Sequence, residues 1–340
     1  MESEIIFVGL GKSGCRILSK IEQHNQNIAS FCYLSSNIDH FPKSTTGEKL
    51  QLVLDIGGKL SPTRIRGIVL SQLEALSSKL KTSKLVVVIS SADGSLGSSL
   101  LPYLTKICSN NNVKCLSILS MPFSFEKQNH FNAGLTLRRS KQYSDGIILI
   151  NNDEIFNAFP QIPMDCAYDL VEDKIAFSLS SLIGSDNRGD INLHNLFQIT
   201  ERNNFSVLSI GESKNVSNKS DIAVKGALKM LSKTANPSSA DRVLLFLNSD
   251  KKLSTSDVAS SINSVHGLVG KQLSHFTHGY KTSNSIQTTA IVLSSGFKNT
   301  IFDDYDPLST LLAGTEIDDD LECDLDILDI DLGIDKISEI

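Results

Sequence analysis

The fold is decided by two glycine- and serine-rich stretches, GLGKSG at residues 9–14 and DGSLGSS at residues 93–99. Each follows an apolar, strand-like run, at residues 5–8 and 85–89, and each precedes a helix-like segment. A loop that turns from a strand into a helix directs free backbone N–H groups and the positive end of a helix dipole at one point, and small residues let a phosphate approach the backbone. Two such loops in one domain predict a site for a di- or triphosphate.

The first loop alone is open to three interpretations. Residues 11–13 (GKS) resemble the end of a P-loop, but that motif requires a glycine five residues before its Gly-Lys step, where this chain has Ile6. Residues 9–14 also spell G-x-G-x-x-G, but the next strand-like run, at residues 31–34, ends in SSN (residues 35–37) where a dinucleotide site has an acidic ribose ligand. The P-loop is therefore disfavoured. A dinucleotide site and a pair of ordinary tight turns in an α/β sheet stay open as alternatives.

The surrounding sequence makes the comparison more specific. The second loop lies in LVVVISSADGSLGSSLLPYL (residues 85–104), and MPFSFE follows at residues 121–126. This pattern resembles the tubulin/FtsZ superfamily, and FtsZ more than tubulin: the family's GGGTGTG loop aligns without a gap on residues 93–99, and its PFxFEG segment on residues 122–127. The resemblance covers about residues 4–298 in the same order. Further similar segments, including the family's strand that ends in a PND turn, lie at residues 145–153, 209–212 and 286–297.

The resemblance implies a guanine nucleotide site that binds GTP or GDP, with Mg²⁺ as an open question and no separate metal site. Glu126 matches the family's ribose-contacting glutamate, and His130 stands where the family usually has an arginine. Tyr168 is expected to stack on the purine, with Asp169 or Glu172 accepting from guanine N1 and N2; a plain core tyrosine is the alternative. The predicted nucleotide-binding residues are Gly9, Gly11, Lys12, Ser13, Gly14, Cys15, Arg16, Gly94, Ser95, Leu96, Gly97, Ser98, Glu126, His130, Tyr168 and Asp169.

The hydrolytic residues of the family are altered in this chain. In FtsZ-like proteins the loop after the central helix carries N-x-D-x-x-D, and in a filament it enters the nucleotide site of the next subunit. The two carboxylate positions match Asn192 and Asn195. An amide can orient a water but cannot take its proton, and general-base help is worth about 10²- to 10⁴-fold in rate. The resemblance therefore predicts a GTPase that is weak or inactive, with Asp190 as a displaced substitute.

Periodicity of apolar residues predicts the fold class: an α/β protein with a doubly wound, mostly parallel sheet, a long central helix and a second, smaller α/β domain. The first-domain strands are expected at residues 5–8, 31–34, 52–54, 85–89, 114–119 and 146–150, and the second-domain strands at residues 206–210, 242–248 and 288–293. Helices are expected at residues 165–183, 221–231 and 256–265. The predicted divisions are a GTP-binding domain (1–162), the central helix with the catalytic-type loop (163–201), a C-terminal α/β domain (202–300) and an acidic, disordered tail (301–340).

The tail differs from the rest of the chain in charge. Residues 303–340 hold 14 of the 38 acidic residues and one basic residue, which gives the tail a net charge of −13 and the preceding residues +7. Such a composition predicts disorder in isolation. Residues 324–332 (DLDILDIDL) nevertheless mix apolar side chains with the acidic ones. In FtsZ-like proteins a tail of this kind ends in a peptide for adaptor proteins, and a solvated acidic spacer is the alternative.

Composition and motifs together lead to one expected function and two alternatives. The chain has no signal-peptide-like start, no apolar run approaching about 18 residues and no C-x-x-C pair among its six cysteines. We expect a cytoplasmic protein with reduced thiols, without nucleic-acid partners or direct membrane insertion. The resemblance implies a GTP-binding, FtsZ-like cytoskeletal protein that self-assembles head to tail into filaments, with a role in cell division or cell shape. The alternatives are a non-polymerising nucleotide-sensing adaptor that acts through its tail, and an NAD(P)-dependent oxidoreductase.

Overall fold

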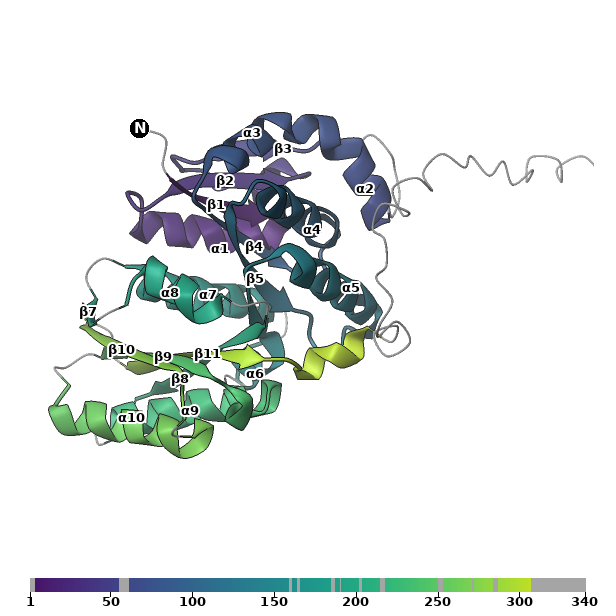
Figure 1. Ribbon diagram of the computed structural model, residues 1–340. Coiled ribbons are helices and arrows are strands. Elements are labelled where there is room, and N and C mark those ends of the chain that lie inside the picture. The colour runs from purple at the N-terminus through teal and green to yellow at the C-terminus, as the bar shows by residue number, and fades with distance from the viewer. Residues whose placement is uncertain are drawn as a thin grey trace, which may run out of the picture.

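The computed structural model describes the chain from Glu4 to Asp306 with short gaps (Figure 1). No helix in this described part is long and apolar enough to cross a membrane. The residues left out inside it are 55–60, 159–160, 164–165, 185–186, 190, 202–203, 215–217, 250–252, 271 and 284–286.

The first half of the chain alternates strands with helices. Its central strands are short, rich in Val, Ile and Leu, and buried on both faces, as parallel strands between two helical layers must be. In chain order the elements are β1 (Ile5–Leu10), α1 (Gly11–His24), β2 (Ser30–Ser35), η1 (Ile38–His40), β3 (Glu48–Gln51), α2 (Pro62–Val69), η2 (Leu70–Leu73), α3 (Glu74–Thr82), β4 (Leu85–Ser91), α4 (Ser95–Asn110), β5 (Lys114–Met121), α5 (Lys127–Tyr143), β6 (Gly146–Asn151) and α6 (Asn152–Asn157).

The second half begins with the long helix that the sequence predicts. The elements are α7 (Ala167–Ile183), β7 (Arg188–Gly189), α8 (Leu193–Thr200), β8 (Phe205–Ser213), α9 (Lys219–Thr234), η4 (Pro237–Ser239), β9 (Arg242–Ser249), α10 (Thr255–Val269), β10 (His275–Thr282), β11 (Thr288–Phe297) and η5 (Ile301–Tyr305).

Both halves share one sheet. In the part of the chain that the structure describes, its 11 strands run in the order β3-β2-β1-β4-β5-β6-β8-β11-β9-β10-β7. The six strands of the first half are parallel, and β8 continues the sheet by pairing in parallel with β6 at Ile147–Phe205 through Leu149–Val207. Strand β11 lies antiparallel between β8 and β9. The predicted fold class is confirmed, with the two halves joined through the sheet itself.

Helices cover both sides of the sheet and enclose two apolar cores (Figure 1). One core is filled by α2 to α5 from the first half and by α9 and α10 from the second. The other is filled mainly by α1, α7 and α8, and α7 packs directly against α1. The central helix α7 therefore contacts the first half of the molecule along one side.

The predicted strands differ from the structure at β3 and at β10. The strand expected at residues 52–54 is β3, which is Glu48–Gln51; Leu52 follows it and is fully buried, and its N–H donates to the Ser35 carbonyl at 2.9 Å. The polar strand β10 was not predicted at all. It lies near the end of the sheet, where the neighbouring strand β7 covers only two of its residues. An edge strand of this kind has weak apolar alternation, so its periodicity gives little signal.

After β11 the chain returns to the first half of the molecule. Helix η5 lies against α5 at Gly134, where an added Cβ would come within 2.7 Å of the Tyr305 backbone. The Tyr305 ring stacks on His130 with ring centres 3.8 Å apart, and Arg138 pairs with the buried Asp306 at 3.1 Å. Residues 301–306, assigned to the tail in the sequence-based division, thus pack on the body. The remainder of the predicted tail, residues 307–340, lies outside the described residues.

Candidate nucleotide-binding site

The two glycine-rich loops meet at one cavity. Strand β1 has β2 on one side and β4 on the other, so the loops that follow β1 and β4 lie beside each other at the point where the strand order reverses. Open α/β sheets bind ligands at this point, outside the carboxyl ends of the strands. The cavity there has a volume of about 340 Å³ and is lined by Leu10, Gly11, Lys12, Ser13, Ser35, Ser36, His40, Ser90, Ser91, Asp93, Gly94, Ser95, Leu96, Gly97, Ser120, Pro122, Glu126, Asn152, Tyr168, Val171 and Glu172.

Two helices present uncapped N-termini to this cavity. The N-cap residues are Leu10 for α1 and Gly94 for α4, and neither provides a side-chain hydrogen bond to its helix. Neither first turn contains an acidic residue. The first backbone N–H groups and the positive dipole ends therefore remain available for an anion. Gly11 begins α1 with a φ of +70°, a backbone conformation that favours glycine.

Other glycines of the two loops serve packing instead. An added Cβ on Gly14 would lie 2.3 Å from the Ile89 carbonyl oxygen, and one on Gly97 would lie 2.2 Å from that of Ser91. A Cβ on Gly9 would lie 2.7 Å from the Gly14 carbonyl oxygen. Helices α1 and α4 thus approach the strand ends closely because these positions have no side chain.

One wall of the cavity is built around Glu126, at the N-cap of α5. Its Oε2 accepts from the Phe123 N–H at 2.9 Å, and its Oε1 accepts from the Tyr168 hydroxyl. The Tyr168 ring meets the Phe123 ring edge-on, with ring centres 5.1 Å apart. Burial and the Glu126 carboxylate both raise the pKa of Tyr168, so its hydroxyl is protonated and donates at neutral pH. Tyr168 and Glu126 are therefore held in fixed positions at the rim.

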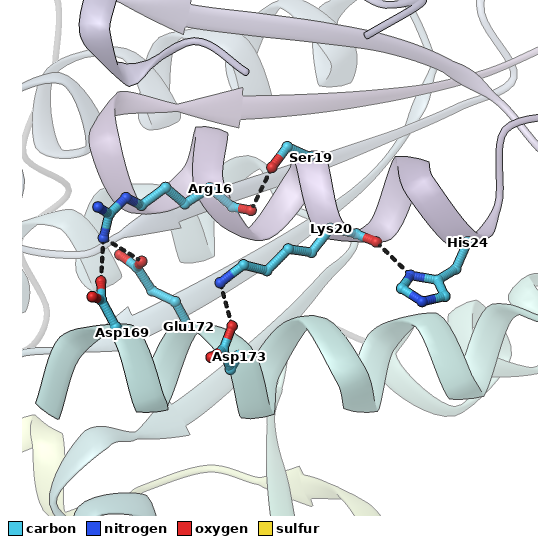
Figure 2. Close-up of polar contacts among 7 residues, drawn as sticks. All are labelled: Arg16, Ser19, Lys20, His24, Asp169, Glu172 and Asp173. Atoms are coloured by element: carbon cyan, nitrogen blue, oxygen red, sulfur yellow. Dashed lines mark hydrogen bonds and ion pairs between the residues drawn. The ribbon is translucent and has the colours of Figure 1, made fainter. Parts of the chain in front are cut away.

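Arg16 and Asp169, both predicted to bind the nucleotide, instead bind each other (Figure 2). Arg16 on α1 also reaches Glu172 on α7 at 3.3 Å, and Lys20 pairs with Asp173 one turn further along. These pairs link α1 to α7 beside the cavity. Of the three acidic residues, Glu172 is the one that lines the cavity; burial raises its pKa, and bonds from Ser13 and Arg16 lower it.

The cavity contains an unexpected carboxylate beside the N-terminus of α4. Asp93 precedes α4, at the first position of the loop where the family has glycine. Burial raises the pKa of Asp93, and the charge of Glu126 adds to this, while a hydrogen bond from Ser91 opposes it. A bound phosphate at the α4 N-terminus would approach this carboxylate closely.

The structure adds two polar residues that the sequence-based prediction missed. Asn152 is buried and lines the cavity, and within the described part of the chain its Oδ1 has no hydrogen-bond partner. His40 also lines the cavity, and its Nδ1 lies 2.8 Å from the Ser35 hydroxyl. Burial and the charges of Lys12 and Arg16 lower the pKa of His40, which keeps it neutral. Asn152 is the asparagine of the PND-like turn, so the resemblance could have predicted it as a site residue. No feature of the sequence indicates that His40 lies in the site.

The predicted binding residues divide into two groups. Gly11, Lys12, Ser13, Gly94, Ser95, Leu96, Gly97, Glu126 and Tyr168 line the cavity. Gly9, Gly14, Cys15, Arg16, Ser98, His130 and Asp169 do not appear in its wall. The Cys15 thiol is buried against the Gly9 and Leu34 carbonyls, the Ser98 hydroxyl donates to the Gly94 carbonyl at 2.9 Å, and His130 bonds the Phe123 carbonyl and stacks on Tyr305.

The residues at the hydrolytic positions lie elsewhere. Helix α7 starts at the cavity and has 17 residues, a length of about 25 Å, and the segment with Asn192 and Asn195 follows its far end. Asn192 is the N-cap of α8, and its Oδ1 accepts from the Asn195 N–H at 3.0 Å. Asp190 lies outside the described residues. These two asparagines are therefore remote from the cavity of their own chain.

The described ranges contain no group of three or more His, Cys, Asp or Glu residues arranged to hold a metal ion. A cavity at the carboxyl ends of parallel strands, faced by two uncapped helix N-termini, is instead typical of α/β proteins that bind phosphorylated ligands through the backbone.

Comparisons with known proteins agree with this class. The model of the "Tubulin/FtsZ family, GTPase domain" matches residues 56–160. A cell division protein FtsZ from Haloferax mediterranei is 20% identical over 330 residues, covering 95% of this chain and 78% of the relative. Among solved structures, an empty FtsZ dimer from M. jannaschii has a TM-score of 0.73 at 17% identity and covers 87% of this chain and 89% of its own. A GTPγS-bound CetZ2 protofilament from Haloferax volcanii has a TM-score of 0.69 at 16% identity, covering 93% and 100%.

These matches confirm the resemblance found in the sequence: the chain is similar to FtsZ proteins over most of its length, and residues 56–160 match the GTPase domain of the tubulin/FtsZ family. They give no support to an oxidoreductase or to a non-polymerising adaptor.

Proposed function

We propose that this protein binds a guanine nucleotide in the cavity between its two glycine-rich loops, assembles head to tail into filaments, and hydrolyses GTP slowly or not at all. The observation that carries the proposal is the convergence of the α1 and α4 N-termini on one cavity. Its far wall holds a tyrosine, a glutamate and a buried asparagine whose Oδ1 has no hydrogen-bond partner among the described residues.

Each part of the nucleotide has a matching part of the cavity. The phosphates would lie at the N-termini of α1 and α4, where Lys12 adds a positive charge. Glu126 is placed to accept from ribose hydroxyls, since it is fixed by the Phe123 N–H and the Tyr168 hydroxyl. At the base end, the Tyr168 ring supplies an aromatic surface, and the Asn152 amide and Glu172 carboxylate supply the polar contacts that distinguish guanine from adenine.

Assembly is supported by the separation of the cavity from α8. Since Asn192 and Asn195 follow the far end of α7, about 25 Å from its start, they can approach a nucleotide only in another copy of the chain. A contact that joins two different surfaces of identical subunits extends into a filament when the rotation does not close. Phe125, 55% exposed and stacked on Phe123 near Glu126, offers apolar area for such a contact.

Calorimetric titration with GTP, GDP and ATP tests the binding step, with and without Mg²⁺. We expect guanine nucleotides to bind and adenine nucleotides to bind at least about tenfold more weakly, because one or two buried hydrogen bonds distinguish the bases. Sedimentation of the protein with GTP then tests assembly. Equal affinity for ATP, or no binding of any nucleotide, would contradict the proposal.

Asp93 should weaken nucleotide binding in a pH-dependent way. Its folded pKa is raised, and a bound phosphate would raise it further, so a proton is taken up on binding. The affinity for nucleotide is therefore highest at pH values below the pKa that Asp93 has in the free protein. It falls as the pH rises through that pKa. Asp93→Asn should tighten GDP binding roughly tenfold near pH 7 by removing the repulsion, and should abolish this part of the pH dependence.

The phosphate groups of the nucleotide titrate in the same way in both measurements. The difference in affinity between Asp93→Asn and the wild type therefore reports on Asp93 alone. Weaker binding of the variant in Mg²⁺ but not in EDTA would contradict the repulsive role, because the carboxylate would then be acting as a metal ligand.

A further inference from the structure

We propose that a groove in the second half of the molecule binds the chain's own acidic segment, DLDILDIDL at residues 324–332. The interaction is within one chain and does not depend on nucleotide binding. It is carried by the shape and charge of the groove and by the position at which the described chain ends.

The groove lies between α6, α7, β8 and α9 and has a volume of about 440 Å³. The side chains of Ile155, Ile210 and Met230 form an apolar floor. Gly211 lets α9 lie directly on β8, since an added Cβ there would come within 1.9 Å of the Ala223 carbonyl oxygen. Gly226 on α9 leaves the wall open, because a Cβ at this position would have its nearest neighbour at 3.4 Å.

The rim of the groove is basic on the α9 side. Lys214 and Lys229 line it and are exposed, and neither has an acidic partner among the described residues. Lys225, which pairs with Asp221 at 2.7 Å, and Lys233 lie on the same face of α9, one turn away in each direction. The other charges that face the groove are Lys174, which pairs with Glu212, and Glu154 on the α6 wall. The α9 side is therefore the side that attracts carboxylates.

The acidic segment has matching chemistry. Its nine residues comprise four aspartates and five Leu or Ile residues. The apolar side chains would cover the floor formed by Ile155, Ile210 and Met230, and the aspartates would meet Lys214 and Lys229. A segment with charge alone would gain little here, because exposed ion pairs contribute at most about 1 kcal/mol each; burial of the apolar side chains adds the larger part.

The described chain ends beside the groove walls. Helix η5 contacts α9, and the charge of Asp153 on α6 contributes, after burial, to the raised pKa of Tyr305. About 17 residues separate Asp306 from the acidic segment. They reach about 58 Å when fully extended, which is long enough for the acidic segment to return to the groove. Such a tether gives an effective concentration in the millimolar range, so even weak binding occupies the groove.

Zero-length carbodiimide cross-linking of the full-length protein, followed by mass spectrometry, tests the interaction. The reagent joins carboxylates to amines only where they are in contact. We expect cross-links from residues 324–331 to Lys214 and Lys229, formed within one chain, and their yield should fall at least fivefold in 0.5 M NaCl. A mixture of ¹⁴N- and ¹⁵N-labelled protein separates links within a chain from links between chains.

Matched variants make the assignment specific. Lys214→Gln with Lys229→Gln should abolish the links to these two positions and reduce total tail-to-body linking at least fivefold. Lys81→Gln, which removes an exposed charge on α3 away from the groove, should leave the linking unchanged. Gly226→Leu should also reduce the linking because its side chain fills the groove, provided that its melting temperature shows an intact fold.

Three results would overturn the proposal: tail links distributed over lysines outside the groove, links unaffected by the double Lys→Gln variant, or links that join differently labelled chains. If the protein failed to bind nucleotide, this inference would still stand, because the cross-linking and the melting-temperature measurements contain no nucleotide.

Discussion

Asn192→Asp combined with Asn195→Asp should raise GTP-dependent phosphate release at least about tenfold over the wild-type protein, at concentrations that allow assembly. The two substitutions restore carboxylates at the start of α8, the segment proposed to reach the nucleotide of the next subunit. Polymers of the wild type should persist with GTP, and those of the variant should have shorter lifetimes. Phosphate release and light scattering, followed in the same sample, measure both effects.

The fold should tolerate this double change. Aspartate caps a helix as well as asparagine does, and its charge is favourable at a helix N-terminus. Asn192 already uses its Oδ1 in this way, so the cap bond to the Asn195 N–H is preserved. Asn192→Ser with Asn195→Gln is the matched control, since it keeps a capping oxygen and adds no charge; its phosphate release should equal that of the wild type.

The prediction has two ways to fail. The double aspartate variant could assemble without faster phosphate release, which would show that the missing carboxylates at positions 192 and 195 are not what limits hydrolysis. Alternatively, the wild type could already release phosphate rapidly. If Asp190→Ala then stopped the release, the displaced aspartate would be the catalytic group, and the role of the two asparagines would be restricted to capping α8.

Gly97→Ala should destabilise the protein by about 3 kcal/mol and abolish nucleotide binding. The added Cβ would lie 2.2 Å from the Ser91 carbonyl oxygen and 2.3 Å from the Ser90 hydroxyl, so α4 must move away from the strand ends. Its backbone N–H groups then leave the phosphate position. Denaturant unfolding gives the change in the free energy of unfolding, and titration with GDP gives the loss of affinity.

Gly94→Ala is the control within the same loop. Its added Cβ would have its nearest neighbour at 3.7 Å, an ordinary contact, and its φ of −62° suits alanine. We expect a loss below about 1 kcal/mol, attributable to the poorer N-cap. Similar destabilisation by both substitutions would show that the loop as a whole is rigid, and that the close approach at Gly97 is not the cause.

The central part of the fold and the core of the site could be predicted from sequence because both depend on local patterns. A run such as LVVVIS at residues 85–90 is too short and too apolar for anything but a buried strand, and the glycines after it fix a turn into a helix. Two such units in one domain place two loops at the same sheet edge. The cavity between them, with Lys12, Ser95 and Glu126 in its wall, follows from that arrangement.

Other parts of the site could not be predicted, because they depend on contacts between distant segments. The rotation of α7 about its axis decides whether Asp169 or Glu172 faces the cavity. Glu172 lines the cavity, and Asp169 pairs with Arg16 of α1 outside the cavity wall. His130 turns toward Tyr305, a residue whose position depends on the chain returning from the second half. A single sequence holds no signal for these pairings, which arise from tertiary packing.

The return of the chain after β11 determines how the protein responds to a pull on its tail. Tension applied beyond Asp306 acts first on η5, through the Arg138–Asp306 ion pair and the Tyr305–His130 stack, and reaches β11 only after η5 has separated from α5. The contacts of η5 with α5 would therefore bear such tension before β11 does, and they lie in the half of the molecule that contains the cavity. Because His130 bonds the carbonyl of Phe123, the loop that carries Glu126 bears part of that load.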